Sequence, residues 1–376
     1  MRIAIDAQPL LEQSAGVTYY SKGLVEAVLK QDRNNHYDLL FWRLFPKKPL
    51  PVLGEGRNFS YRWQRFFPYK IFYKLFKWGI RIPLELFFLI RPDLYFFPNF
   101  VVYPHRRGKS VVLIHDLTFE KVPQYVARRN VDFLKKFVPP SVARADQVVV
   151  NCEFTKRELI EAYRVPAEKV TVAYPGVDPK SFYPRSAKDK EEIKRKYGIN
   201  KPFLLFLGTL EPRKNVPAIL KVYADLPNRR DFNLVLAGKR GWLSEEIFRT
   251  VADLGLEEDV IFTGYVPEED RPKLMSAAEV FVFPSFFEGF GMPVVEAQAC
   301  GTPVVTSNTT SLPEAAGKGA VLVDPKNVYQ LARAIEEVLS SGSLREKLVK
   351  KGLANARRFD WNESARKLIE IFNRLG

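Results

Sequence analysis

Short apolar runs alternate with helical patterns along the whole chain, and this alternation constrains the fold more than any other feature. The runs are apolar almost throughout and lack the polar alternation of a half-exposed strand, so they suit parallel strands that helices cover on both faces. The pattern predicts the α/β class with two doubly wound sheets. The expected strands are 2–6, 38–42, 93–97, 110–114, 147–150, 170–173, 203–207, 233–238, 260–264, 280–284, 302–306 and 320–324.

Helical patterns fall between these strands, and a chain of 376 residues is long enough for two domains of ordinary size. The stretch YPGVDPKSFYP, around Pro175–Pro184, is rich in turn-forming residues and is the expected link between the domains. The main expected helices are 17–30, 126–144, 154–163, 326–341, 343–358 and 361–375.

The charge of the chain is lopsided. The net charge is +15, and residues 1–183 hold 29 Lys and Arg against 17 Asp and Glu, which gives this half +12. Such asymmetry indicates an anionic partner for the first half. Cys152 and Cys300 give no disulfide framework, so we expect a reducing compartment. We expect neither a secretory signal nor a membrane span, because the chain starts with a strand pattern and no run of 18 apolar residues occurs.

The loop GTLEPRKN (208–215) lies between an expected strand and an expected helix. Gly208 allows close backbone approach at the strand end. Arg213 and Lys214 then stand at a helix N-terminus, where amide groups and positive charge together suit a phosphate. An ordinary solvated loop is the competing interpretation.

The stretch PSFFEGFGMPVVEAQACGTPVV (284–305) has a glycine-rich loop followed by Pro293 in the first turn of a helix. The free amides at this helix start suit an anion. Glu288 on the loop and Glu296 inside the helix are poor phosphate ligands but good acceptors for sugar hydroxyls. Two surface glutamates would be the competing interpretation, and it explains Glu296 poorly because buried strands flank its helix.

Two further stretches lie at expected strand ends. His115 and Asp116 follow the strand 110–114, at the edge where open α/β sheets bind ligands, although a lone histidine is usually structural. Gly16, in QSAGVTYYSKG (13–23), is similar to the opening of a phosphate loop. A single glycine is a weak signal, and the full GxGxxG fingerprint is absent from the sequence.

Taken together and in this order, these stretches resemble the retaining glycosyltransferases of family 4, with the GT-B architecture. The most specific parts are the E-x7-E element from Glu288 to Glu296 and the GTLEPRKN loop. The resemblance covers essentially the whole chain. It implies an acceptor-binding Rossmann-like domain over 1–180 and a nucleotide-sugar-binding one over 181–358, facing a central cleft. It also implies that a helix in 359–376 crosses back to the first domain.

The resemblance implies roles for the donor-site residues. Arg213 and Lys214 bind the donor diphosphate, and Glu296 holds the ribose hydroxyls of the nucleotide. Glu288 binds the donor sugar and the adjacent phosphate, with the backbone amides of Gly289, Phe290 and Gly291.

The remaining implied roles belong to other strand ends. His115 faces the transferred sugar, and Gly16 lies under the donor phosphates. Gly264 and Tyr265 belong to the loop that brackets the base, and Gly208 is a further donor-binding residue. Two positions depart from the family pattern. Thr209 stands where many relatives have arginine, and Ala15-Gly16 replaces a pair of glycines.

The residues also bear on the mechanism. The sequence has no D-x-D pair, and His36, His105 and His115 show no metal-ligand spacing, so we expect no metal and no cofactor beyond the nucleotide sugar. Cations and helix amides would then stabilise the leaving diphosphate. Because no carboxylate is clearly placed as a nucleophile, the hypothesis is a same-face displacement that retains the anomeric configuration.

The donor follows from resemblance. LAGKRGWL (236–243) and GTLEPRKN are similar to the mannosyltransferase branch, so GDP-mannose is the expected donor of a hexosyltransferase in cell-surface polysaccharide or glycolipid synthesis. UDP-sugars and other GDP-sugars remain alternatives, as does a GT-B sugar-nucleotide epimerase. Lys239 and Arg240 either contact the base or are simply solvated.

The segment 61–83, YRWQRFFPYKIFYKLFKWGIRIP, has nine aromatic residues, six cations and no acid. Lys70, Lys74, Lys77 and Arg81 share one stripe of an expected helix over 69–82, next to a stripe of apolar residues. A basic amphipathic helix of this kind suits an anionic lipid interface, whereas a core helix with a solvated cationic face is the alternative. The expected membrane- or acceptor-binding cations are Arg62, Arg65, Lys70, Lys74, Lys77 and Arg81.

Membrane contact would make the acceptor a lipid-linked saccharide and place a cytoplasmic enzyme on the inner face of the cytoplasmic membrane. Binding of RNA or DNA is the alternative from a different class of function, because a basic chain with interleaved aromatics is typical of such proteins. The sequence shows no RNA-binding motif or helix-turn-helix pattern, and nucleic-acid binding would leave the nucleotide-sugar elements unexplained. We therefore expect no nucleic-acid partner.

Overall fold

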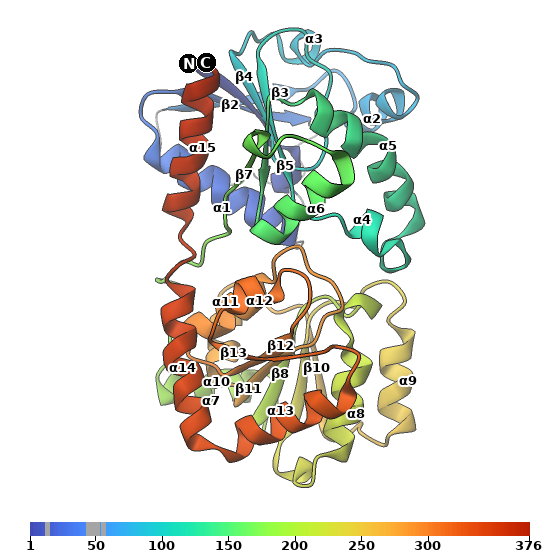
Figure 1. Cartoon of the computed structure of the whole chain (residues 1–376), viewed down its shortest axis with the longest axis vertical. Helices are drawn as coiled ribbons and strands as arrows, with labels where there is room; N and C mark the ends of the chain where they lie inside the picture. The colour runs from blue at the N-terminus through green and yellow to red at the C-terminus, as the bar shows by residue number, and fades with distance from the viewer. Residues whose placement is uncertain (12–15, 43–52, 54–57) are drawn as a thin grey trace. The chain divides into compact units, whose positions relative to one another are not determined.

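The chain folds into two units in the computed structural model, which describes residues 1–11, 16–42, 53 and 58–376 (Figure 1). Unit 1 contains Met1–Gly176 and Asp360–Gly376, and unit 2 contains Val177–Phe359. The chain therefore passes between the units twice. The first crossing lies in the proline-rich stretch where the link was expected, four residues before the expected boundary after residue 180.

Unit 1 is built on a seven-stranded sheet with the order β3-β2-β1-β4-β5-β6-β7, in which every pairing is parallel. Six of its strands were expected from apolar runs. The seventh, β3, was missed because its sequence, FSYRWQ, alternates polar and aromatic residues at the edge of the sheet. The strands are β1 (Arg2–Asp6), β2 (His36–Trp42), β3 (Phe59–Gln64), β4 (Leu94–Phe97), β5 (Lys109–Ile114), β6 (Gln147–Val150) and β7 (Val170–Val172).

Helices cover both faces of this sheet (Figure 1). On one face, Val28 of α1 and Leu368 of α15 pack with Ile5 of β1 in one core cluster. On the other face, Phe76 of α2 and Phe137 of α5 belong to a second cluster. The main helices of unit 1 are α1 (Gly16–Gln31), α2 (Tyr69–Lys77), α3 (Glu85–Phe88), α4 (Thr118–Lys121), α5 (Arg128–Arg144), α6 (Glu153–Tyr163) and α15 (Trp361–Leu375).

The C-terminal helix α15 is part of unit 1 although it follows unit 2 in the sequence. Its first turn is capped by Asp360, whose carboxylate accepts a hydrogen bond from the backbone amide of Asn362 at 2.9 Å. Phe372 is fully buried, and its ring lies 5.7 Å from that of Phe96 and 6.4 Å from that of Tyr37. The core of unit 1 therefore depends on both ends of the chain.

Unit 2 repeats the plan with a six-stranded parallel sheet of order β10-β9-β8-β11-β12-β13. All six strands were expected. They are β8 (Phe203–Leu207), β9 (Asn233–Ala237), β10 (Val260–Gly264), β11 (Val280–Phe283), β12 (Val304–Ser307) and β13 (Ala320–Val323). The helices are α7 (Ala187–Lys196), α8 (Val216–Asp225), α9 (Glu245–Asp253), α10 (Arg271–Ala277), α11 (Met292–Ala299), α12 (Leu312–Ala316), α13 (Val328–Ser340) and α14 (Gly342–Ala356).

The segment 61–83 differs from the single long helix that we expected over 69–82. Helix α2 ends at Lys77, and Gly79 adopts φ +92°, a left-handed conformation that most residues avoid. The amide of Gly79 donates to the carbonyl of Phe76, and the amide of Ile80 donates to that of Leu75. This pair of hydrogen bonds is typical of a helix C-terminus, so Arg81 lies outside the helix. Among the residues described, no helix is long and apolar enough to span a bilayer.

Each sheet has one point where the strand order reverses, and there the loops at the carboxyl ends of the strands diverge to opposite faces. In unit 1 this point lies between β1 and β4, and in unit 2 it lies between β8 and β11. Ligands of open α/β sheets bind at such points. In unit 2, the two loops that leave β8 and β11 are those that hold Arg213, Lys214 and Glu288.

Candidate active site

A buried ion cluster joins the two loops at the switch point of unit 2. The Nζ atom of Lys214 lies 2.6 Å from Oε1 of Glu288, and Nη1 of Arg213 lies 2.9 Å from Oε2. Nη2 of Arg213 also contacts Glu211 at 2.6 Å. Lys214 and Glu288 are both buried, so the structure brings together three residues that the sequence analysis had placed in two separate motifs.

The charges in this cluster determine its protonation state. Burial alone would raise the pKa of Glu288, but the adjacent charges of Arg213 and Lys214 lower it to about 2. Burial lowers the pKa of Lys214, and Glu288 opposes that shift. Glu288 is therefore ionised at neutral pH and balances two cations that would otherwise be costly to bury. An incoming diphosphate could take over this role, because its oxygens offer the same charge-assisted hydrogen bonds.

The backbone around Glu288 is fixed by the loop that follows β12. The amide of Glu288 donates to Oγ1 of Thr310 at 3.3 Å, and the hydroxyl of Ser311 donates to the carbonyl of Glu288 at 2.8 Å. Thr310 has φ +59°, which is unusual for a β-branched residue and marks local strain. The sequence analysis missed both residues, because nothing in NTTS points to a neighbour more than 20 positions away.

Helix α11 begins directly after the Glu288 loop. Gly291 caps it with φ +99°, and a Cβ atom at this position would come within 2.6 Å of the Leu312 side chain. Any other residue would be strained at this φ and would require the Leu312 side chain to move. Helix α11 therefore starts directly after the loop that holds Glu288, Gly289 and Phe290.

Glu296 lies inside α11 and is fully buried. Its Oε2 atom accepts a hydrogen bond from Nη2 of Arg271 at 2.5 Å, whereas Oε1 has no hydrogen-bond partner in the described part of the chain. Burial raises the pKa of Glu296 and Arg271 opposes the shift. A buried carboxylate oxygen without a partner is a strong acceptor for a ligand hydroxyl. Arg271, on α10, was not predicted from the sequence.

Three of the remaining predicted donor-site residues lie at the ends of two strands of unit 2 that are separated by β9. Gly208 directly follows β8, and Gly264 and Tyr265 lie where β10 ends. The ring of Tyr265 is half exposed, and Nζ of Lys239 lies 4.7 Å from its centroid. These residues and the ion cluster all lie at the carboxyl ends of the strands of the unit 2 sheet.

His115 lies at the carboxyl end of β5 in unit 1, next to the switch point, and is buried. Its Nε2 donates to the carbonyl of Pro98 at 2.9 Å, and its own carbonyl accepts a hydrogen bond from Nδ2 of Asn151 at 2.6 Å. The ring of Tyr20 meets it edge-on at 5.6 Å. Burial lowers the pKa of His115 to about 4, so the imidazole is neutral at physiological pH.

Two features of this edge were not predicted from the sequence. Asp6, the last residue of β1, is buried, and burial raises its pKa to about 7. Trp361, the first residue of α15, stacks on Tyr20 at 5.6 Å, so the C-terminal helix supports a neighbour of His115. Gly16 is the exposed first residue of α1, and residues 12–15 of the predicted first loop, including Ala15, lie outside the described residues.

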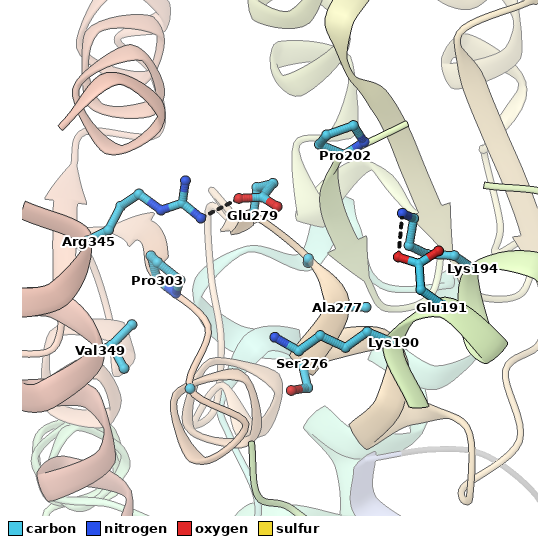
Figure 2. A pocket seen from close by; sticks show the side chains of 12 residues that line it. Lys190, Glu191, Lys194, Pro202, Ser276, Ala277, Glu279, Pro303, Arg345 and Val349 are labelled. Atoms are coloured by element: carbon cyan, nitrogen blue, oxygen red, sulfur yellow. Dashed lines mark hydrogen bonds and ion pairs between the residues drawn. The ribbon is translucent and has the colours of Figure 1, made fainter. Parts of the chain in front are cut away.

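A separate cavity of about 240 Å³ lies at the opposite edge of the unit 2 sheet (Figure 2). Pro202, Glu279 and Pro303, which line it, each directly precede a strand, so the cavity lies at the amino ends of β8, β11 and β12. Four of its lining residues form two ion pairs with each other, Lys194–Glu191 and Arg345–Glu279. The cavity is therefore distinct from the donor-site residues. Within the described residues, no cluster of three or more His, Cys, Asp or Glu side chains could hold a metal ion.

The sequence and the fold are both similar to known proteins. Residues 189–354 match the family Glycosyl transferases group 1, and residues 31–181 match Glycosyltransferase Family 4. The chain is 34% identical over 285 residues to O-antigen chain mannosyltransferase B of Escherichia coli, which covers 75% of this chain and 74% of that protein. It is 33% identical over 276 residues to the serotype-specific mannosyltransferase WbdA of Escherichia coli, a match of 71% of this chain and 34% of that protein. The chain thus spans about a third of the length of WbdA.

Solved structures agree with this relationship at the level of the fold. Sucrose-phosphate synthase from Thermosynechococcus elongatus superposes with a TM-score of 0.77 at 20% identity, over 100% of this chain and 99% of that one. HepE of Anabaena in complex with UDP and glucose superposes with a TM-score of 0.75 at 19% identity, over the full length of both chains. The chain therefore belongs to glycosyltransferase family 4, has the GT-B fold, and is similar to the mannosyltransferases of that family.

Proposed function

We propose that this glycosyltransferase transfers mannose from GDP-mannose, with retention of the anomeric configuration, to a saccharide or lipid-linked acceptor in the synthesis of a cell-surface polysaccharide or glycolipid. The mannosyl assignment is supported by the two mannosyltransferase relatives. A lipid-linked acceptor would bring the reaction to the inner face of the cytoplasmic membrane.

One observation carries the donor site: the Arg213–Lys214–Glu288 cluster at the switch point of unit 2. In the proposal, the diphosphate of the donor takes the two cations, which stabilise the charge that develops on the leaving group. Glu288 and the amides of residues 289–291 then hold the sugar and the adjacent phosphate. Oε1 of Glu296 accepts the ribose hydroxyls, which would supply the hydrogen bond that this oxygen lacks.

The proposed reaction is a same-face displacement. The bond between the anomeric carbon and the phosphate oxygen breaks, the acceptor oxygen bonds to the same face of that carbon, and the acceptor proton passes to the departing diphosphate. The cations at 213 and 214 make this leaving group stable without a metal ion. His115 keeps the role expected from the resemblance, and its neutral imidazole fits a hydrogen bond to an uncharged sugar hydroxyl.

A thermal-shift panel tests the donor class. The full chain is mixed, without metal, with GDP-mannose, GDP, UDP-glucose, UDP-N-acetylglucosamine and UDP. A ligand at 100 times its Kd stabilises the folded protein by about 2.7 kcal/mol, which gives a clear shift. Stabilisation by the GDP compounds would support the proposal, whereas stabilisation by UDP compounds alone would contradict the mannosyl assignment. Product analysis by NMR then reads the anomeric configuration, and inversion would refute the same-face mechanism.

A UDP-sugar donor is the second possibility, and one comparison favours it. The solved HepE structure, which shares the fold at full length, contains UDP and glucose. Arg213 and Lys214 would bind either diphosphate equally well, because this group is common to the two donor classes. Discrimination therefore rests on the loops after β9 and β10, where Lys239 and Tyr265 lie.

A further inference from the structure

Exposed large apolar side chains are concentrated in one segment of unit 1. Six of the thirteen such side chains among the described residues lie between positions 66 and 89, a segment of 24 residues. Phe66 is 94% exposed, Leu89 is 88% exposed and Trp78 is 66% exposed. The other three are Ile71, Ile80 and Leu86. Large apolar side chains gathered in this way usually mark an interaction surface.

The segment is held in place by a buried layer of aromatic rings. The ring of Phe87 lies 5.0 Å from that of Phe67 and 5.4 Å from that of Phe72, which joins α3 to the start of α2. The side-chain Nε2 of Gln64, at the end of β3, donates to the carbonyl of Phe87 at 2.7 Å. The exposed apolar side chains therefore project from a structured base, and burying them against a partner would not require the segment to refold.

The overlapping segment 61–83 carries six cations and no acid. Of its six cations, Arg62 alone has a carboxylate partner among the described residues, Asp38 at 2.7 Å. Arg62 and Asp38 lie on the paired strands β3 and β2, so Arg62 contributes less free charge than the other five cations. Lys74 and Arg81 instead lie over the rings of Trp78 and Phe76, each at 4.7 Å. Arg65, Lys70 and Lys77 complete the set, and no acid occurs between Gly56 and Leu84.

We infer that α2, α3 and the loops beside them form a docking surface for an anionic lipid bilayer. The cations would lie among the lipid headgroups, and Phe66, Trp78 and Leu89 would enter the interfacial layer. Charge complementarity selects this partner, since a second copy of the same surface would bring like charges together. The inference goes beyond the proposed donor chemistry and does not depend on which nucleotide is bound.

Charge reversal tests the electrostatic part. The full chain is mixed with vesicles of 70% phosphatidylcholine and 30% phosphatidylglycerol, and bound protein is measured by flotation. The variant Lys70→Glu/Lys74→Glu/Lys77→Glu should bind at least ~100-fold more weakly, because each cation near such a surface contributes substantially to binding. The control Lys347→Glu/Lys350→Glu/Lys351→Glu changes the net charge equally on exposed residues of α14 and should bind normally. An equal loss in both variants would overturn the inference.

Removal of the apolar side chains tests the insertion. The variant Phe66→Ser/Trp78→Ser/Leu89→Ser should bind these vesicles about 10-fold more weakly, including at salt concentrations that screen the charges. Its control is Tyr329→Ser, on α13, where the side chain is 75% exposed. In the parent protein, vesicles should shift the Trp78 fluorescence to the blue, and Trp78→Phe should remove that shift. Full binding by the triple variant, or no fluorescence shift, would refute insertion.

A nucleic acid competes for the same chemistry, so a single-stranded RNA 20-mer is measured in parallel. Tight binding of this RNA that is lost in the Lys70/Lys74/Lys77 variant and falls steeply with salt, without vesicle binding, would overturn the lipid assignment. Donor-induced thermal stabilisation is recorded for every variant. It should be unchanged, because none of the substituted residues is a proposed donor-site residue, and it therefore shows that unit 2 is folded in each variant.

Discussion

The two units share one plan but differ in the chemistry at the carboxyl edge of their sheets. Both sheets are parallel, and each has one switch point. At this edge unit 2 has a buried cluster of charges, with Glu288 ionised between Arg213 and Lys214. Unit 1 has a neutral imidazole, His115, among aromatic rings, and five cations without a carboxylate partner in the described residues lie on α2 and the loops beside it. One backbone plan therefore carries a cluster of buried charges in unit 2, which we propose binds a diphosphate, and a neutral imidazole in unit 1, which we propose faces sugar hydroxyls.

The largest effect that separates the units should come from Phe372→Ala. This side chain is fully buried between Phe96 and Tyr37 in unit 1, so its loss should lower the free energy of unfolding of that unit by about 3–5 kcal/mol. Urea unfolding measures the change, and donor-induced stabilisation of unit 2 should persist. Val328→Ala, at an exposed site in unit 2, is the control. Equal destabilisation by both variants would show that α15 is not a core element of unit 1.

Lys214→Ala should have the largest effect on the reaction. Removal of one donor from a charge-stabilising site typically lowers kcat by about 100- to 1000-fold. The melting temperature should fall much less than this loss implies, because Arg213 still pairs with Glu288. Lys190→Ala, in the cavity at the opposite edge of the sheet, is the matched control and should retain full turnover. Near-normal turnover of Lys214→Ala would contradict the proposed donor site.

The pH dependence of stability should separate the two buried titratable groups of unit 1. The folded His115 stays neutral down to about pH 4, whereas an unfolded histidine binds a proton near pH 6.5. The unfolded state thus holds more protons between these values, so stability rises with pH across that window, by roughly 3 kcal/mol. His115→Gln should remove this slope in chemical unfolding measured from pH 4 to pH 7.

Asp6 should produce the opposite slope. Its folded pKa is about 7, so the folded state holds the extra proton between about pH 4 and pH 7 and loses stability as pH rises through that window. The stability of Asp6→Asn relative to the parent protein should therefore be higher at pH 8 than at pH 5. Parallel pH profiles for the parent protein and both variants would show that neither group is buried as described.

Glu296→Ala should have a smaller and more specific effect, a weakening of donor binding by about 10- to 150-fold with modest change in turnover at saturating donor. The lost group is one charged hydrogen-bond acceptor, which is typically worth about 1.5–3 kcal/mol. Arg271→Ala should weaken donor binding through the same carboxylate, and the double variant should be little worse than either single variant. Additive losses would show that Arg271 does not act through Glu296.

The sequence predicted most of the sheets, and the reason is local. A strand covered on both faces must be apolar at nearly every position, so twelve of the thirteen strands are visible as apolar runs. The exception, β3, is an edge strand whose exposed positions carry polar residues. The helix over 69–82 was predicted too long because Gly79 ends it, and that signal was present in the sequence. The chemical character of both motif loops of unit 2 was also predictable, because glycine, proline and charge at strand ends follow local rules.

Only the tertiary structure decided which of these groups meet. Lys214 and Glu288 are 74 positions apart, and Arg271 and Glu296 are 25 apart, yet both pairs lie within hydrogen-bonding distance. Thr310 and Trp361 take their roles from neighbours that no sequence spacing indicates. The sequence by itself determined two parallel α/β units and the types of residue at their edges, because periodicity and turn chemistry act over a few residues. Pairing, burial and protonation state came from the fold, because desolvation and charge act through space.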